Sequence, residues 1–408
     1  MNLYSIAIPS LGRSELLKSQ TIKTLQHHNI PKSVISIFVI QEEYETYKDT
    51  LPDYNIVVGV LGLVKQKEFI EKYYPVNTNI LFLDDDIQEI DLDTFQNLDD
   101  LITTGFDECI LRGSYIWSIY PVWNKFYRQT KEYLSTSLKH CIGCFTGIIN
   151  RKDNPKVILC NDREDVERSI KYFMRDGIVI RFNKVGYKTK FFNQGGLGLL
   201  KDRIDRIEND CDLLNLHYGS FGKLRMKKDC INFDLHKLPS HIPIQIPINP
   251  DEFFVLYDML CCITIPMKNK TNSRREFGKH RCMTFGFVKE RYSGKVGLSL
   301  PSQKYPEIYD EIVRIGNLFG FEFTSIHLNH NVICPRHKDS NNNGNSLLVS
   351  FGDYTGCNIM IDEKKYDANC NGIIFDGSKL EHYNTDDLVG NKYSLVYYRM
   401  RQQMEKDN

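Results

Sequence analysis

The stretch from Cys334 to Tyr398 constrains what this chain can fold into more than any other part of the sequence. His337 and Asp339 are two positions apart, so in a strand their side chains point to the same face. His382 follows later, and the segments between alternate apolar and polar residues, as the strands of a small barrel or jelly roll do. Two imidazoles and one carboxylate can occupy one face of an iron ion and leave the other positions open. We therefore expect an Fe(II) site inside a C-terminal β domain.

Open coordination positions are where a co-substrate and oxygen bind, so this pattern is typical of an oxygenase that uses 2-oxoglutarate. Two further histidines, His327 and His330, lie just before the triad. Period-two placement favours one of them beside the substrate or co-substrate, and neither is assigned as an iron ligand.

The length and composition are those of an ordinary soluble protein. The 408 residues predict two or three domains, each with its own core. The 52 basic and 52 acidic residues cancel, so binding to nucleic acid would need a local basic patch. The N-terminus lacks the pattern of a secretory signal, and no apolar run is long enough for a membrane span. With 12 scattered cysteines, we expect an intracellular protein, cytoplasmic or nuclear, with reduced thiols and no membrane partner.

The N-terminal half alternates apolar strands with helices. Strands are predicted at residues 4–9, 34–40, 55–60 and 79–83, and helices within 10–28 and 63–74. This alternation favours a parallel α/β sheet, in which ligands bind at the carboxyl ends of the strands. Asp84, Asp85 and Asp86 directly follow the last of these strands and so lie at such an end.

Three adjacent carboxylates repel one another, and a solvated turn is the simplest explanation. After a fully apolar strand, however, a divalent cation held by oxygen ligands and shared with a diphosphate is favoured. A strand followed by DxD is typical of nucleotide-sugar transferases of the GT-A type, which hold Mn²⁺ or Mg²⁺ there. Further along, Glu164 and Asp165 begin a predicted helix, where acidic residues either suit the helix dipole or supply a general base. A glycine-rich loop from Gln194 to Gly198 either turns or closes over a phosphate.

The chain changes character between residues 199 and 250, where a charged helix and a basic piece lead into a run punctuated by prolines. An extended linker or edge segment is predicted there, with domains at 1–235 and 236–408. The second domain contains the most basic stretch of the chain, which is either a solvated loop or a contact for a nucleic-acid backbone. Its candidate residues are Lys268, Lys270, Arg274, Arg275, Lys279 and Arg281.

The motifs of the first half resemble a known family. IAIPSLGR, VGVLGLVKQKEFI, FLDDDI, IYPVWN, REDVERSIKYFMRDG and NQGGLG are similar to the glycosyltransferases associated with TET/JBP oxygenases, over roughly residues 1–215. The resemblance implies a GT-A (Rossmann-like) fold, a UDP-sugar as nucleotide-sugar donor, and Mn²⁺ or Mg²⁺, for which Asp84 and Asp86 are the expected ligands. Residues expected at the nucleotide sugar are Pro9, Ser10, Arg13, Lys65, Gln66, Lys67, Asp84 and Asp85. Asp165, with Glu164, is the candidate catalytic base. Lys67 stands where family members often have arginine, so the charge is kept but the two-pronged fork is lost.

The second half resembles the TET/JBP dioxygenases of fungi, algae and large DNA viruses or phages, over about residues 235–404. RCMTFGF, KYPEIY, FTSIHLNHNVICPRHKDSNNNGNSLLVSFGDYTG, FDGSKLEH and KYSLVYY carry this resemblance. It implies a double-stranded β-helix (jelly-roll or cupin-like) with flanking helices, which binds Fe(II) on His337, Asp339 and His382 together with 2-oxoglutarate.

The family anchors the distal carboxylate of 2-oxoglutarate with an arginine just before the SLVYY run, where this chain has Lys392. Arg399 is the competing candidate, but an odd separation puts the two on opposite sides of one strand. Lys392 is favoured. A second departure is Cys357, which replaces a common glycine and is expected to narrow the pocket slightly.

Together the two halves predict successive steps of one pathway. The C-terminal half would hydroxylate a base methyl group in DNA, on thymine or 5-methylcytosine, and the N-terminal half would add a sugar, with glucose expected. Because a base inside a duplex cannot reach either site, the nucleotide would be flipped out or single-stranded. One alternative is a protein hydroxylase and glycosyltransferase of the lysyl type. Another is that one half is an inactive binding module.

Overall fold

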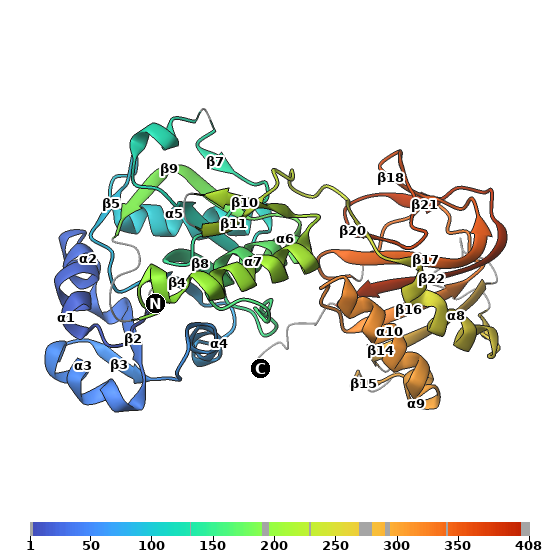
Figure 1. Cartoon of the computed structure of the whole chain (residues 1–408), viewed down its shortest axis with the longest axis horizontal. Helices are drawn as coiled ribbons and strands as arrows, with labels where there is room; N and C mark the ends of the chain where they lie inside the picture. Colours follow the sequence, from blue (N-terminus) through green and yellow to red (C-terminus); the bar gives the residue numbers. More distant parts are fainter. Residues whose placement is uncertain are drawn as a thin grey trace. The chain divides into compact units, whose positions relative to one another are not determined.

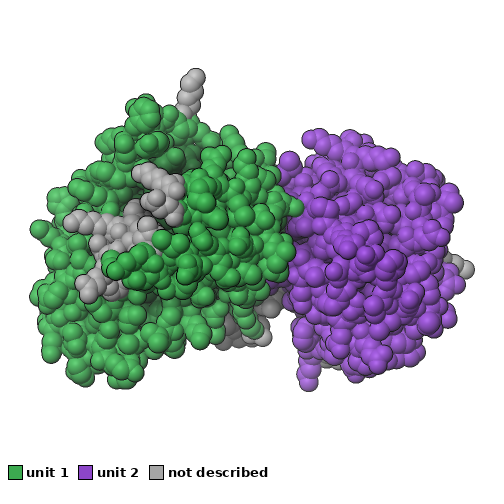
Figure 2. All heavy atoms as spheres, in the orientation of Figure 1, with its two compact units in different colours: residues 1–240 green, residues 241–408 purple. Residues whose placement is uncertain are grey.

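The computed structural model describes residues 3–130, 132–189, 196–227, 230–268, 280–289, 294–339 and 342–400. The chain divides into two compact units, Met1–Ser240 and His241–Asn408, shown in green and purple in Figure 2. The division falls within the proline-punctuated run, a few residues after the predicted boundary at 235. Among the described residues, no helix combines the length and the apolar character that crossing a bilayer requires.

The first unit combines strands and helices (Figure 1). Its mixed sheet has the strand order β3-β2-β1-β4-β8-β6-β9-β5, with β7 beside β9. Its strands are β1 (Ser5–Pro9), β2 (Ile35–Val39), β3 (Asn55–Val58), β4 (Asn79–Leu83), β5 (Glu89–Asp91), β6 (Ile116–Tyr120), β7 (Leu134–Ser135), β8 (Phe145–Ile149) and β9 (Ile180–Lys188). The first four strands are parallel, as predicted. The expectation of a wholly parallel sheet is wrong, because β8 runs antiparallel to both β4 and β6. An apolar run marks a buried strand but carries no information about its direction.

Helices and a hairpin complete the first unit. The α-helices are α1 (Ser14–Leu17), α2 (Lys23–His27), α3 (Tyr44–Thr50), α4 (Leu63–Tyr73), α5 (Leu98–Arg112), α6 (Glu164–Asp176) and α7 (Ile204–Tyr218), and the hairpin is β10 (Gly222–Lys227) with β11 (Cys230–Leu235). Trp117 of β6 is fully buried at the centre of the core. Gly105 and Gly147 make room for its indole, because a Cβ added at either position would lie 2.4 or 1.9 Å from it. This close packing fixes β6 and β8 against α5.

The second unit consists of antiparallel sheets arranged as a double-stranded β-helix. The larger sheet has the order β12-β20-β17-β22-β16-β14-β13 with β15 beside β14, and the smaller has the order β19-β18-β21. The strands are β12 (Ile244–Pro247), β13 (Met267–Lys268), β14 (His280–Lys289), β15 (Val296–Leu298), β16 (Ser325–His330), β17 (Ser346–Thr355), β18 (Ile359–Ile361), β19 (Lys364–Tyr366), β20 (Asn371–Phe375), β21 (His382–Asn384) and β22 (Val389–Tyr398). The flanking helices are α8 (Phe254–Cys261), α9 (Leu300–Lys304) and α10 (Pro306–Leu318). The edge position of β12 explains how this strand tolerates Pro247.

The fold classes expected for both halves are thus present. The first unit is an α/β domain of the GT-A type, and the second is a double-stranded β-helix with flanking helices.

Candidate active sites

The second unit brings His337, Asp339 and His382 together, although His337 and Asp339 do not lie in a regular strand as expected. His337 forms only an isolated bridge with His382, in which each N–H donates to the other carbonyl at 3.0 and 3.1 Å. Asp339 is fixed separately, since its N–H donates to the Gly377 carbonyl at 2.8 Å. The Asp339 carboxylate packs closely against Gly377, because a Cβ added at Gly377 would lie 3.2 Å from Asp339 Oδ2. Backbone hydrogen bonds therefore set the positions of all three side chains.

Among the described residues, this triad is the only group that brings three histidine, cysteine or carboxylate donor atoms within 4.8 Å of one another. Nε2 of His337 and Nε2 of His382 each lie 3.7 Å from an oxygen of Asp339. Each Nδ1 faces a backbone carbonyl instead, that of Pro335 at 2.7 Å and that of Leu380 at 3.0 Å. A proton held on Nδ1 by these carbonyls places the lone pair on Nε2, the nitrogen that faces the carboxylate. The donor set and its orientation suit Fe(II).

A cavity of about 200 Å³ surrounds the triad. It is lined by the triad and by His280, His327, Asn329, Cys334, Asn342, Ser346, Leu348, Ile359, Ala368, Phe375, Asn384, Lys392, Ser394, Val396 and Tyr398. Within it, Lys392 is buried, and its Nζ donates to the Cys357 carbonyl at 2.8 Å and contacts Cys357 Sγ at 3.0 Å. Arg399 follows the end of β22 and pairs with Glu322 at 3.1 Å instead of lining the cavity. Of the two candidate anchors, the structure brings Lys392 to the triad and not Arg399.

The two histidines before the triad separate as period-two placement suggests. His327 lines the cavity and its Nδ1 lies 3.1 Å from Thr284 Oγ1. His330 is absent from the lining, stacks on Tyr393 with 4.6 Å between ring centroids, and contacts Asn391 Oδ1 at 2.7 Å through Nε2. Sequence reasoning missed His280, which enters the cavity from the start of β14 and has no motif of its own.

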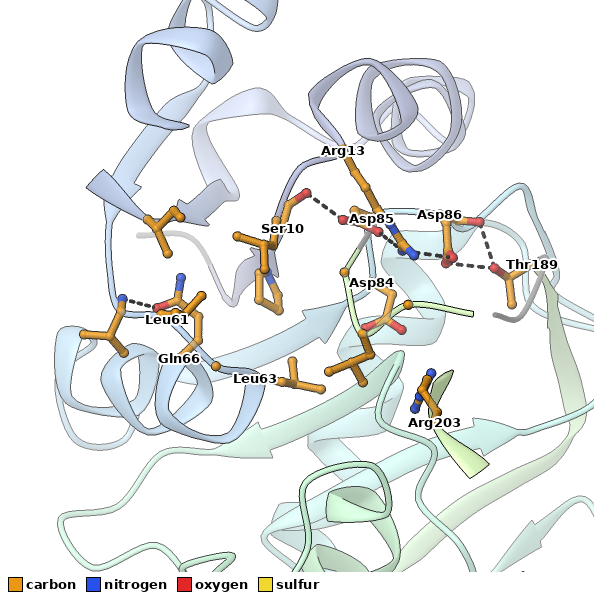
Figure 3. Close-up of a pocket in the computed structure, with 18 residues that line it drawn as sticks. Ser10, Arg13, Leu61, Leu63, Gln66, Asp84, Asp85, Asp86, Thr189 and Arg203 are labelled. Carbon is orange, nitrogen blue, oxygen red and sulfur yellow. Dashed lines mark hydrogen bonds and ion pairs between the residues drawn. The ribbon is translucent and has the colours of Figure 1, made fainter. Parts of the chain in front are cut away.

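The first unit contains a second cavity, of about 220 Å³, at the carboxyl ends of β1 and β4. Figure 3 shows Arg13 and Arg203 on opposite sides of Asp84 in this cavity. Of the residues predicted at the nucleotide sugar, it is lined by Pro9, Ser10, Arg13, Gln66, Asp84 and Asp85, together with Asp86. Lys65 is exposed on α4 and Lys67 is buried, and neither lines the cavity. The predicted basic segment therefore contributes Gln66 to this wall and directs both lysines elsewhere.

The three aspartates have different partners. Asp85 accepts hydrogen bonds from Ser10 Oγ at 2.6 Å and Arg13 Nη1 at 3.1 Å, and Asp86 accepts one from Thr189 Oγ1 at 2.8 Å. Burial raises the pKa of all three carboxyl groups. For Asp85 and Asp86, the positive charge of Arg13 partly offsets this rise. For Asp84 the pKa rises to about 7, since burial and the neighbouring carboxylates outweigh Lys67. A divalent cation would relieve this repulsion, so Asp84 and Asp86 suit a metal whose remaining ligands come from a diphosphate.

Asp84→Asn is expected to stabilise the protein when divalent cations are removed. Ionising Asp84 costs free energy in the folded state as the pH rises from its ordinary pKa of 3.8 towards about 7, so folding stability falls across that window. This rise in the pKa of Asp84 corresponds to a loss of at most roughly 4 kcal/mol of folding free energy, at about 1.36 kcal/mol per pKa unit. Thermal unfolding in a chelator checks this. The variant should melt above the wild type at pH 8 and by a smaller margin at pH 5. The exposed Asp49→Asn serves as control, and equal melting temperatures at pH 8 for Asp84→Asn and wild type would contradict the expectation.

Both predicted bases lie at the start of α6, in unequal surroundings. Glu164 is buried and forms ion pairs with Lys67 at 2.5 Å and Arg168 at 3.1 Å. Burial alone would raise the pKa of Glu164, but the charges of Lys67 and Arg168 hold it below its usual value. Its carboxylate is thus fully committed to internal partners, so Glu164 acts in the framework of the site and is a poor candidate base.

Asp165 has a different set of partners, and its Oδ1 accepts the Val166 N–H at 2.9 Å. Its Oδ2 accepts the Gly143 N–H at 3.1 Å and lies 2.9 Å from His140 Nε2. Burial would raise its pKa, but the His140 imidazole and these contacts lower it below the usual range. Gly143 permits the close approach of Asp165, because a Cβ added at Gly143 would lie 3.2 Å from Asp165 Cβ. The role of His140 was not predicted from the sequence. The only feature that could have indicated it is its position shortly before Gly143, whose N–H contacts α6 at Asp165.

The loop before α6 is held by two carboxylates. Asp210 Oδ2 accepts the N–H groups of residues 161, 162 and 163 at 3.0, 2.7 and 3.0 Å. Glu167 accepts those of residues 158, 159 and 160, each at 3.0 Å. These bonds fix the point at which the helix begins and so position Asp165.

Two of the remaining predicted segments are only partly described. Gln194 and Gly195 lie outside the described residues, whereas Gly196 and Gly198 line the first cavity. Arg203, missed by sequence reasoning, follows this loop and pairs with Asp162 through Nε. Of the basic stretch, Arg281 is exposed and its Nη1 donates to the Ile265 carbonyl at 2.9 Å. The side chain of Lys268 lies outside the described part of the structure. The remaining nucleic-acid candidates, which also lie outside it, are Lys270, Arg274, Arg275 and Lys279.

Comparison with known proteins gives distant structural matches. No protein-family model matches the chain, and no curated protein matches its sequence. NgTET1 in complex with 5mC DNA is 13% identical with a TM-score of 0.29, over 39% of this chain and 72% of that chain. TarS from S. aureus is 12% identical with a TM-score of 0.35, over 52% of this chain and 65% of that chain.

A third match is glucosyl-3-phosphoglycerate synthase from Mycobacterium tuberculosis in complex with Mn²⁺, uridine-diphosphate-glucose and phosphoglyceric acid. It is 12% identical with a TM-score of 0.35, over 58% of this chain and 89% of that chain. At such low identities and scores, the function of this chain has to be inferred from the residues that line the cavities described above.

Proposed function

We propose that this chain is a bifunctional enzyme that modifies a DNA base in two steps. The second unit hydroxylates a base methyl group with Fe(II), oxygen and 2-oxoglutarate, and the first unit transfers a sugar from a UDP-sugar to the new hydroxyl group. The observation that carries the proposal is the triad of His337, Asp339 and His382, with both Nε2 atoms facing one carboxylate inside a cavity that holds a buried lysine. The DNA base as substrate is supported by the extended motif around the triad, which resembles the TET/JBP dioxygenases.

In the oxygenase unit, the side chains hold and orient the reactants. Iron bound by the triad would supply oxygen activation at the expense of 2-oxoglutarate, which is oxidatively decarboxylated. Lys392 would bind the distal carboxylate, since its buried ammonium lies in the same cavity. Apolar side chains of Leu348, Ile359 and Phe375 form part of the wall and limit the entry of water.

In the sugar-transfer unit, charge is arranged around the donor. A divalent cation on Asp84 and Asp86 would neutralise the diphosphate that leaves with the nucleoside. Arg13 and Arg203 line the same cavity and would offset the negative charge that develops there. Asp165 would accept the proton of the acceptor hydroxyl group, and its position next to His140 keeps it ionised at neutral pH.

One experiment tests the proposal as a whole. The protein is incubated with DNA containing thymine or 5-methylcytosine, together with Fe(II), 2-oxoglutarate, Mn²⁺ and UDP-glucose. The DNA is then digested, and the masses of the nucleosides are measured by mass spectrometry. The base should gain one oxygen atom without UDP-glucose and one further hexose with it. Omission of 2-oxoglutarate should prevent both changes. If no DNA substrate yields a modified base, the proposal is wrong, and modification of a lysine-containing peptide would identify a protein-directed enzyme.

Lys392→Met is expected to raise the KM for 2-oxoglutarate by about 10- to 100-fold, because a charge-assisted hydrogen bond contributes roughly 1.5–3 kcal/mol. Lys392→Arg alone should also bind poorly, since Cys357 Sγ lies 3.0 Å from Nζ and obstructs a bulkier guanidinium. Combining Lys392→Arg with Cys357→Gly should restore binding. Succinate formation at varied 2-oxoglutarate concentrations measures all three. An unchanged KM in Lys392→Met would exclude Lys392 as the anchor.

A further inference from the structure

Three basic residues come from segments that the fold brings together in the first unit, outside the donor cavity. They are Lys139, Arg181 and Lys237, called the cationic cluster from here on. Arg181 belongs to β9, and Lys139 and Lys237 lie in neighbouring loops. The Leu138 N–H donates to the Leu238 carbonyl at 2.8 Å, which holds these two loops side by side. Strand pairing and this bond thus gather three positive charges from distant parts of the sequence.

Arg181 has no acidic partner among the residues that the structure describes. Its guanidinium lies 4.7 Å from the centre of the Tyr120 ring, and its Nε donates to Asn183 Oδ1 at 3.0 Å. Its terminal nitrogens make no hydrogen bond or ion pair with a described residue, and they are not sealed from solvent. Burial lowers the pKa of Arg181, and that of Lys139 is lowered by burial and then by Arg181 and Lys237. Glu132 supplies an opposing charge but is exposed and pairs with none of the three. An anion bound here would satisfy the terminal nitrogens of Arg181.

One residue of the cationic cluster is adjacent in sequence to the partner of the candidate base. Lys139 directly precedes His140, whose Nε2 is 2.9 Å from Asp165 Oδ2. The next residue, Cys141, is buried within reach of the charges of both Arg181 and Asp165. None of the three basic residues lines the cavity that holds Arg13 and the aspartates. An anion at this place would therefore belong to the acceptor and not to the nucleotide sugar.

We propose that the cationic cluster binds a phosphate of the sugar acceptor, so that the acceptor is a nucleotide within a phosphodiester-linked strand. This inference rests on the sugar-transfer function proposed above and specifies its substrate class. Arg181 would present its paired N–H groups to the phosphate oxygens, and Lys139 and Lys237 would add point charges. A base turned out of a strand stays attached to phosphates on both sides, which places an anion near the reacting hydroxyl. A hydroxylysine peptide carries positive charge and would be repelled.

The acceptor preference tests this inference. Sugar transfer is measured to one hydroxymethylated base presented as free nucleoside, as nucleoside monophosphate and as short single-stranded oligonucleotide. The wild type should use the oligonucleotide far better than the nucleoside. Lys139→Met/Lys237→Met and Arg181→Met should each raise the KM for the oligonucleotide by about tenfold or more, with little change for the nucleoside. Lys223→Met, an exposed lysine of β10, is the matched control and should change neither.

Two readouts separate this inference from the proposed function. Hydrolysis of UDP-glucose without acceptor reports the donor site and should persist in both cluster variants. Equilibrium binding of the labelled oligonucleotide should weaken in the variants, and the dependence of its affinity on salt should become shallower. The inference is overturned if nucleoside and oligonucleotide are equal acceptors, or if the variants bind the oligonucleotide as the wild type does. Absence of both transfer and donor hydrolysis, with variant-sensitive binding intact, would reject the sugar-transfer function alone. Should Arg181→Met fail to fold, the double lysine variant gives the same answer, since both of its positions are at least partly exposed.

Discussion

Asp339→Ala should abolish base oxidation and leave sugar transfer to a pre-hydroxymethylated oligonucleotide intact. Asp339 supplies the only negative charge of the triad, and its two oxygens face Nε2 of both histidines at 3.7 Å. Loss of groups that merely orient a metal ligand costs about 10–100-fold, so loss of the ligand should cost at least ~100-fold in succinate formation. Iron content after desalting should fall in parallel.

The matched control is His330→Gln, which removes an imidazole of the same unit that lies outside the cavity. It should keep both iron and activity. Oxidation of the base by Asp339→Ala at the wild-type rate would show that the triad is not the iron site. Loss of sugar transfer in the same variant would instead show that the first unit depends on an intact second unit.

Asp86→Ala should have the opposite effect, stopping sugar transfer while the hydroxymethylated base accumulates. Asp86 lies with Asp84 at the end of β4, where a divalent cation would meet the donor diphosphate. Removing one stabilising group from such a site costs about 100–1000-fold in rate. Nucleoside mass analysis measures both products in one reaction.

A structural effect of this substitution has to be separated from loss of the metal, because Asp86 also accepts a hydrogen bond from Thr189. Asp86→Asn keeps a hydrogen-bonding group and should raise the Mn²⁺ concentration needed for half-maximal transfer. Glu89→Ala removes an exposed carboxylate three positions away and should behave as wild type. Wild-type transfer by Asp86→Ala would exclude Asp86 as a metal ligand.

Residues set by backbone periodicity could be predicted from the sequence. The apolar run at 79–83 makes a buried strand, so the position of the three aspartates at its end follows from the order of residues. Lys392 lines the cavity of the triad, as favoured, and Arg399 does not. Arg399 lies beyond the end of β22, so the alternation of one strand does not by itself explain this difference.

Features that depend on distant partners could not be predicted in this way. Lys67 was expected at the nucleotide sugar, but Glu164 draws it into the interior, and the two residues are far apart in the sequence. Arg203 and His140 belong to no motif. Arg203 reaches its site beside the loop that Asp210 holds, and His140 reaches Asp165 beside the Gly143 N–H that also contacts that carboxylate. The direction of β8 depends on the connections around it, which composition does not report.

The described residues that line the first cavity run from Pro9 to Arg203 in the first unit, and those that line the second run from His280 to Tyr398 in the second unit. For the proposed two-step function, we therefore expect the oxidised base to appear at once and the glycosylated base only after a lag. The length of that lag reports how long the intermediate waits between the two catalysts, and adding separately purified first unit should shorten it.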